Sequence, residues 1–181
     1  MRLLLRMCCL LLGMSNLLAA GLASADTSEA AERPNIVWIF AEDMNDWYGC
    51  YGHDVVETPH VDGLAERGVR FTRAYMPAGV CSATRSAIAL GAMQTTYGVH
   101  NHRSSRRRVP GEVNHLPEGV KTVYEHLREG GYYVVSQGMN KDDFNFPFEA
   151  NKLYDSHNYR GDFAQPAWRD RAEGQPFFAQ V

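Results

Sequence analysis

The apolar and polar positions along the chain alternate between short strand-like runs and stretches with helical spacing. Residues 35–40 form an almost continuous apolar run that ends at two acids, which predicts a strand buried on both faces of a covered sheet. Residues 58–68 carry apolar side chains at helical spacing between a proline and a glycine, and residues 81–90 follow a short loop, so both stretches predict helices. Between them, residues 69–75 predict a short strand.

The second half of the chain continues this alternation. Residues 122–128 predict a helix that ends at Gly130 and Gly131, residues 132–135 predict the strand after it, and residues 176–181 resemble the start of another strand. Because helices alternate with strands, we expect an α/β fold with an open, mainly parallel sheet. The final apolar run leaves two interpretations open: a domain that continues beyond it, or a short protein with a C-terminal edge strand.

The composition and the first residues indicate an exported globular protein. Hydrophobic residues make up 45% of the chain and charged residues 22%, and the net charge of −3 gives no reason to expect nucleic-acid binding. Arg2 and Arg6 precede a broken apolar run and then the small residues Ala23-Ser24-Ala25, a pattern typical of a secretory signal peptide. An uncleaved membrane anchor is disfavoured because the run is short. We expect a signal peptide over residues 1–25, a linker over 26–34, and a secreted or periplasmic protein without a membrane anchor after cleavage.

Two cysteines remain once the signal peptide is set aside, Cys50 and Cys81, because Cys8 and Cys9 lie within it. Two cysteines do not make a disulfide scaffold, although they could pair with each other in an oxidising compartment. The spacing alone leaves this pairing open.

Two short stretches could carry chemistry. Glu42 and Asp43 follow the first predicted strand, where ligand sites of α/β sheets gather, and their carboxylates suit Ca²⁺ or Mg²⁺. Solvated or capping acids are the common alternative. Cys81 and Arg85 lie one turn apart at the start of a predicted helix, so an anion there would meet the guanidinium and the helix N–H groups. The alternative is a buried small residue beside a surface arginine.

The segment from Cys81 to Arg85 resembles the signature of the type I sulfatases, whose cysteine is oxidised to Cα-formylglycine. Four further stretches resemble motifs of that family, in the family's order: residues 33–37, 49–52, 58–65 and 68–75. The resemblance implies an alkaline-phosphatase-like sandwich, in which helices cover a central, mainly parallel sheet. Residues 35–181 would then be the N-terminal part of the catalytic domain, truncated before the rest of the active site.

The same resemblance implies roles for individual residues. Cys81 corresponds to the formylglycine precursor, and a formylglycine-generating maturation enzyme is therefore an expected partner. Arg85 corresponds to the residue that stabilises the aldehyde hydrate, and Lys141 to a residue that contacts the sulfate oxygens. Glu42 and Asp43 correspond to the first two metal ligands and modified Cys81 to a further one, with Ca²⁺ as the expected ion and Mg²⁺ as the alternative.

Three positions depart from the family's common pattern. Asp143 stands where relatives often carry a histidine, so it is a candidate for substrate binding. Glu42 stands where most relatives have an aspartate, a change that the flexible coordination of Ca²⁺ can absorb. Ala83 stands where proline is commonest, which bears on the modification of Cys81.

One cationic stretch, residues 100–108, could line the entrance for a polyanionic substrate, although a solvated loop is the common explanation of such a run. Its members His102 and Arg103 are the nearest in sequence to the predicted helix of Cys81. We therefore keep both as candidates for substrate binding.

The implied activity is hydrolysis of sulfate monoesters on small molecules or polysaccharides, by covalent catalysis through the hydrated aldehyde. The family takes its remaining metal ligands and catalytic residues from later in the chain. We therefore expect these 181 residues alone to be inactive or poorly folded. Two alternatives stay open: a phosphate or phosphonate monoester hydrolase of the same superfamily, and a secreted non-catalytic binder of sulfated glycans, which predicts an unmodified Cys81.

Overall fold

The computed structural model describes residues 33–103, 114–137, 141–158 and 164–181. The predicted signal peptide, most of the predicted linker and the basic residues 106–108 lie outside these ranges. Residues 34–181 cluster as one unit. No helix among the described residues is both long and apolar enough to cross a membrane.

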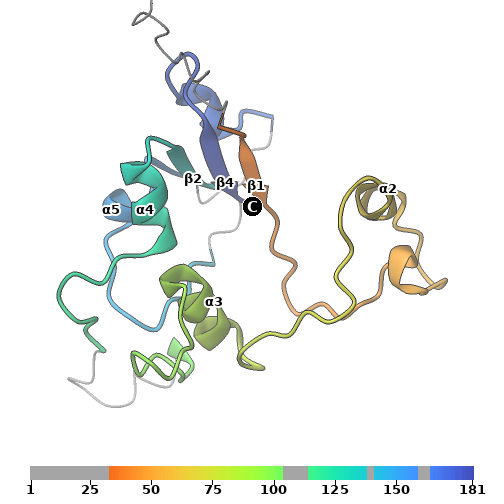
Figure 1. Cartoon of the computed structure of the whole chain (residues 1–181), viewed down its shortest axis with the longest axis horizontal. Helices are drawn as coiled ribbons and strands as arrows, with labels where there is room; N and C mark the ends of the chain where they lie inside the picture. The colour runs from red at the N-terminus through yellow and green to blue at the C-terminus, as the bar shows by residue number, and fades with distance from the viewer. Residues whose placement is uncertain (1–32, 104–113, 138–140, 159–163) are drawn as a thin grey trace, which may run out of the picture. The chain divides into compact units, whose positions relative to one another are not determined.

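Among the described residues, four parallel strands form one sheet (Figure 1). Its strands are β1 (Ile36–Trp38), β2 (Tyr133–Gln137), β3 (Ser156–Asn158) and β4 (Phe177–Gln180), in the spatial order β1-β4-β2-β3. The prediction of a mainly parallel sheet is confirmed. The alternative of a C-terminal edge strand is wrong, because β4 lies between β1 and β2 and all four of its residues are buried.

The described helices are α2 (Pro59–Arg67), α3 (Cys81–Leu90), α4 (Val123–Glu129) and the short α5 (Ala150–Leu153), with 3₁₀ turns η1 (Gly49–Tyr51) and η3 (Ala167–Asp170). The three helices that the sequence predicted, α2, α3 and α4, are present among the described residues, and α5 was not predicted. A capping box between Thr122 and Glu125 fixes the start of α4, a feature that stabilises a helix by about 1 kcal/mol. Gly91 ends α3 with a φ of 60°, a left-handed conformation that glycine adopts without a steric cost.

The main core lies where α4 contacts β2 and α3. Tyr124 of α4, Val134 of β2 and Phe178 of β4 are buried there together with Phe144. The Phe144 ring packs against Tyr124 and stacks on Phe146 at 5.2 Å. This packing anchors the loop that contains Lys141 and Asp143 beside the first turns of α3.

Two sequence-based predictions are wrong. Residues 69–75 form no strand: Val69, Phe71 and Tyr75 are largely exposed, and no described strand pairs with this segment. Strand propensity needs a neighbouring strand and a surface to pack on, and neither is present for this segment among the described residues. β1 is not buried on both faces, since it is an edge strand of the described sheet and Val37 is 52% exposed.

Candidate active site

Small buried side chains let α3 pack closely at its N-terminal end. Ser82, Ala83 and Ser86 are each fully buried, while Cys81 and Arg85 keep partial access to solvent. The preceding loop is tied to the helix because the Thr84 hydroxyl donates a 2.7 Å hydrogen bond to the Ala78 carbonyl. The N-cap residue of α3, Val80, makes no capping hydrogen bond through its side chain, so the first N–H groups of the helix are suited to an anion.

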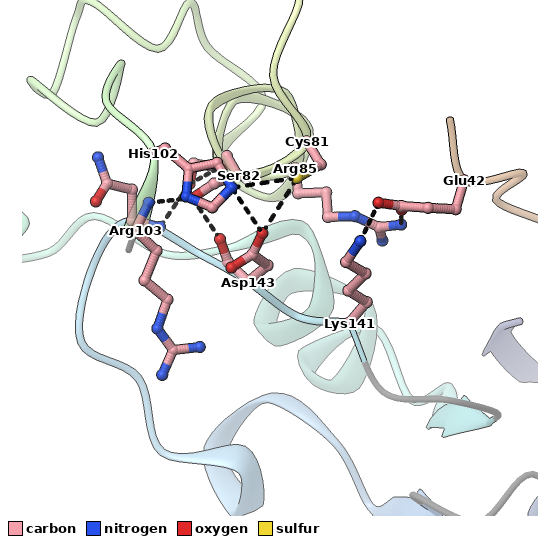
Figure 2. Close-up of polar contacts among 10 residues, drawn as sticks. Glu42, Cys81, Ser82, Arg85, His102, Arg103, Lys141 and Asp143 are labelled. Atoms are coloured by element: carbon pink, nitrogen blue, oxygen red, sulfur yellow. Dashed lines mark hydrogen bonds and ion pairs between the residues drawn. The ribbon is translucent and has the colours of Figure 1, made fainter. Parts of the chain in front are cut away.

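The two buried serines of α3, Ser82 and Ser86, bond to the neighbouring loops, and Figure 2 shows the contacts of Ser82. The Ser82 hydroxyl donates to the Asp143 carbonyl at 2.6 Å and accepts from the Arg103 N–H at 3.1 Å. One turn later, the Ser86 hydroxyl accepts from the Asn145 N–H at 2.8 Å. The loops that contain Arg103 and Asp143 are therefore positioned beside Cys81 by hydrogen bonds from their backbone to α3.

Cys81 faces an acid and an imidazole. Its thiol donates a hydrogen bond to Oδ2 of Asp143 at 3.3 Å, and its Sγ lies 3.6 Å from Nε2 of His102. The same His102 nitrogen lies 3.9 Å from the Asp143 carboxylate. Burial raises the pKa of the Cys81 thiol above its ordinary value, and the hydrogen bond to Asp143 raises this pKa further. The sulfur is therefore a neutral thiol at neutral pH and a poor nucleophile.

A second group of charges forms around Glu42 (Figure 2). Its Oε2 accepts from the Arg85 guanidinium at 2.7 Å, and its Oε1 accepts from the Lys141 ammonium. The Lys141 hydrogen bond is the main cause that lowers the pKa of Glu42, and the same bond raises the pKa of Lys141. The Arg85 guanidinium also lies over the Phe40 ring at 5.2 Å. Two cations thus converge on one anionic group beside the N-terminus of α3.

A pocket of about 270 Å³ opens beside these charges. Its walls include residues at the carboxyl ends of β2 and β4, in agreement with the rule that places ligand sites there. The lining residues are Phe40, Glu42, Arg85, Ser136, Gln137, Lys141, Gln180 and Val181.

The predicted site residues therefore fall into two groups. Cys81 meets His102 and Asp143, whereas Glu42 meets Arg85 and Lys141. These groups are adjacent along α3, because Cys81 and Arg85 are one turn apart.

Two further predicted residues are placed differently. Asp43 adopts a φ of 48°, and its carboxylate contributes to the raised pKa of Lys141. The Arg103 backbone is held by Ser82, but its side chain points away from Cys81 (Figure 2).

Sequence reasoning missed Ser82 and Phe40 as parts of this site. Ser82 and Ser86 are four residues apart in a predicted helix, so their shared face could have been read from the spacing. Neither cysteine is in a disulfide, so the pairing of Cys50 with Cys81 does not occur in this structure.

Comparisons with known proteins identify the family of this chain. Residues 34–175 match the family model described as Sulfatase. An ulvan-active sulfatase of Formosa agariphila is 34% identical over 152 residues, which are 82% of this chain and 24% of that protein. Human arylsulfatase A is 40% identical over 122 residues, covering 67% of this chain and 22% of that protein.

A solved structure also shares the fold. It holds its substrate, D-glucosamine-2-N,6-O-disulfate, and matches 82% of this chain and 33% of its own with a TM-score of 0.63 at 18% identity. The chain thus spans about a quarter of the length of the curated relatives it matches. On the family model and these relatives together, the chain belongs to the sulfatase family.

Proposed function

We propose that the complete protein hydrolyses sulfate monoesters, with Cys81 converted to Cα-formylglycine as the nucleophile. The observation that carries this proposal is the convergence of Arg85 and Lys141 on one carboxylate beside Cys81. Sulfate oxygens are anionic acceptors like the Glu42 oxygens, so the same two cations can hold a sulfate group. The first turn of α3 adds N–H donors at the same place.

The state of the Cys81 sulfur supports a modified nucleophile. Thiolates attack and thiols do not, yet burial and Asp143 keep this group protonated. The hydrated aldehyde has two hydroxyls. One attacks the sulfur atom of the sulfate ester and releases the alcohol, and the second later expels inorganic sulfate. Arg85 and Lys141 bind the sulfate oxygens and stabilise the charge that develops on them. Asp143 and His102 lie within reach of the Cys81 side chain, where they can orient its polar groups.

The family also implies a divalent metal ion, and the residues present fit one. Glu42 has a lowered pKa and faces two cations, so its carboxylate is ionised and accommodates positive charge. Asp43 places a second carboxylate next to it, and such oxygen donors suit Ca²⁺, with Mg²⁺ as the alternative. Glu42, Asp43 and modified Cys81 would hold the ion, which would supply Lewis-acid polarisation of a bound oxygen.

The substrate we propose is a carbohydrate sulfate ester, of a small molecule or a polysaccharide. One relative is named for activity on ulvan, and a structural neighbour is bound to a disulfated glucosamine. His102, with 39% of its side chain exposed, and Arg103 are the proposed contacts to the sugar, together with Asp143. The proposed signal peptide over residues 1–25 would deliver the enzyme to the periplasm or the exterior, where such polymers occur.

The test is peptide mass spectrometry across Cys81 on the complete protein from its native host, combined with assays on an aryl sulfate and an aryl phosphate. Replacement of the thiol by an aldehyde lowers the peptide mass by about 18 Da, and the modified protein should release sulfate faster than phosphate. An unmodified thiol with no turnover would contradict the proposal. Faster turnover of the phosphate would move the enzyme to phosphomonoester chemistry.

A further inference from the structure

Three side chains at the start of α3 form a cluster with the donor set of a transition-metal site. Cys81, His102 and Asp143 offer a sulfur, an imidazole nitrogen and a carboxylate oxygen that all lie within 4.8 Å of one another. They come from three segments: the first residue of α3, the stretch that follows it, and the loop after β2. Figure 2 shows the three side chains directed toward a common point.

The separations fit a tetrahedral ion. Zn²⁺ with a sulfur at about 2.3 Å and nitrogen and oxygen at about 2.0 Å requires its ligand atoms to lie about 3.3 to 3.6 Å apart. The observed separations are 3.6 Å between Sγ and Nε2, 3.3 Å between Sγ and Oδ2, and 3.9 Å between Nε2 and Oδ2. Two of the three already match this geometry. The third separation, between Nε2 and Oδ2, is longer than this range. A small rotation of the partly exposed His102 side chain that moves Nε2 by a fraction of an ångström would shorten it.

The surroundings hold the donors in place without a metal. The Ser82 hydroxyl bonds the Asp143 carbonyl and the N–H of Arg103, so one buried group supports the chain on both sides of the cluster. Asp143 also has a φ of 32°, a backbone conformation that is uncommon for a residue other than glycine. Such supporting contacts typically decide the affinity of metal sites.

We propose that the folded protein binds Zn²⁺ through Cys81, His102 and Asp143 whenever Cys81 keeps its thiol. Thiolate and imidazole prefer Zn²⁺ over Ca²⁺ and Mg²⁺, so this site differs in ion from the proposed oxygen site of Glu42 and Asp43, with which it shares only position 81. A Zn–S bond forms, the S–H bond breaks and the proton passes to the buffer, leaving a fourth position for water. Conversion of Cys81 to an aldehyde removes the sulfur. The site therefore belongs to the unmodified form of the protein.

The raised pKa of the Cys81 thiol is consistent with this role. Burial and the Asp143 carboxylate disfavour a thiolate when no cation is present. A divalent cation bound between these groups reverses that effect, because it neutralises both the thiolate and the carboxylate. Zn²⁺ would thus protect the thiol from alkylation and oxidation.

The experiment uses the complete protein expressed without the maturation enzyme, verified by mass to retain the thiol and then made metal-free. Co²⁺ is the optical probe, since a thiolate–cobalt charge-transfer band appears only if sulfur coordinates the ion. We expect one equivalent of Co²⁺ to produce the band, Zn²⁺ to abolish it by displacement, and Ca²⁺ to leave it unchanged. Loss of the band in C81S, and at least about tenfold weaker binding in H102Q and D143N, would support the site.

The matched control is C50S, which removes the other cysteine of the described residues and should retain the band at full intensity. A near-ultraviolet circular dichroism spectrum checks that each variant is folded. The proposal is overturned if folded wild-type protein gives no band, if C81S keeps it, or if H102Q and D143N bind as tightly as wild type. Since metal binding is measured on the thiol form and turnover on the modified form, failure here is distinguishable from failure of the proposed sulfatase activity.

Discussion

The Cys81 thiol donates a hydrogen bond to Oδ2 of Asp143 at 3.3 Å, although 62 residues separate the two in the chain. The contact exists because the Asp143 backbone is bound to Ser82, the residue that follows Cys81. An acid at this distance keeps the sulfur protonated, in addition to the effect of burial. Before its proposed conversion to formylglycine, Cys81 is therefore held as a neutral thiol.

The first prediction concerns this pair. In D143N the carboxylate charge is removed, so the pKa of the Cys81 thiol falls toward its ordinary value, although burial still raises it. At a fixed pH below that pKa, alkylation of Cys81 by iodoacetamide should become several-fold faster in the metal-free, unmodified protein. Mass spectrometry of the two cysteine-containing peptides measures this rate. Cys50 serves as the control, since its own raised pKa comes from burial and Asp62 and should not change.

The second prediction concerns Ser82. S82A removes a buried hydroxyl that bonds the partly buried Asp143 carbonyl and Arg103 N–H, which should lower the free energy of unfolding by about 1 kcal/mol. Because Asp143 and Arg103 lose a contact that positions them beside Cys81, turnover of an aryl sulfate should fall as well. T122A is the control: it removes a buried hydroxyl that caps α4 and contacts none of the site residues described above, so it should destabilise by about 1 kcal/mol and spare turnover. Equal losses of turnover in both variants would contradict the positioning role of Ser82.

The elements with strong local signals were predicted well from the sequence. Residues 81–90 form α3 as expected, since the loop before the helix and Gly91 after it mark both ends. α4 and β2 lie within two residues of their predicted bounds for the same reason, a capping box and a glycine pair. β3 was missed because Ser156–Asn158 has no apolar pattern of its own and forms by pairing with β2.

The site was predicted less completely, because its contacts are long-range. The pairing of Glu42 with Arg85 spans 43 residues, and that of Glu42 with Lys141 spans 99. Spacing within one helix places Arg85 near Cys81, but no local rule brings Glu42 to both cations. The family resemblance supplied these residues as separate roles. The structure adds that Glu42 forms ion pairs with both Arg85 and Lys141. It also shows that His102 and Asp143 lie together beside Cys81.

The third prediction tests the strength of the Glu42 contacts. Arg85 has only 12% of its side chain exposed, so E42A leaves a poorly solvated guanidinium without its carboxylate. We expect the free energy of unfolding, from urea denaturation, to fall by about 1–3 kcal/mol. E149A is the control, because the Lys152–Glu149 pair is largely exposed and solvent screens it, so its loss should change the stability little. A loss in E42A no larger than in E149A would show that Arg85 gains little from this carboxylate.

The last prediction concerns the shape of the cation at position 85. The Arg85 guanidinium contacts Glu42 and lies over the Phe40 ring, and its planar fork is the group we propose for holding sulfate oxygens. Lysine keeps the charge in R85K but loses the fork and the stacking, so kcat/KM for an aryl sulfate should fall by about 10²–10³. R128K is the matched control, since Arg128 is a half-buried arginine that bonds Asp155 and two carbonyls remote from Cys81. R128K should lose stability and keep kcat/KM. If R85K retained wild-type kcat/KM while remaining folded, a point charge would suffice at this position, and the proposed role of the guanidinium fork would be wrong.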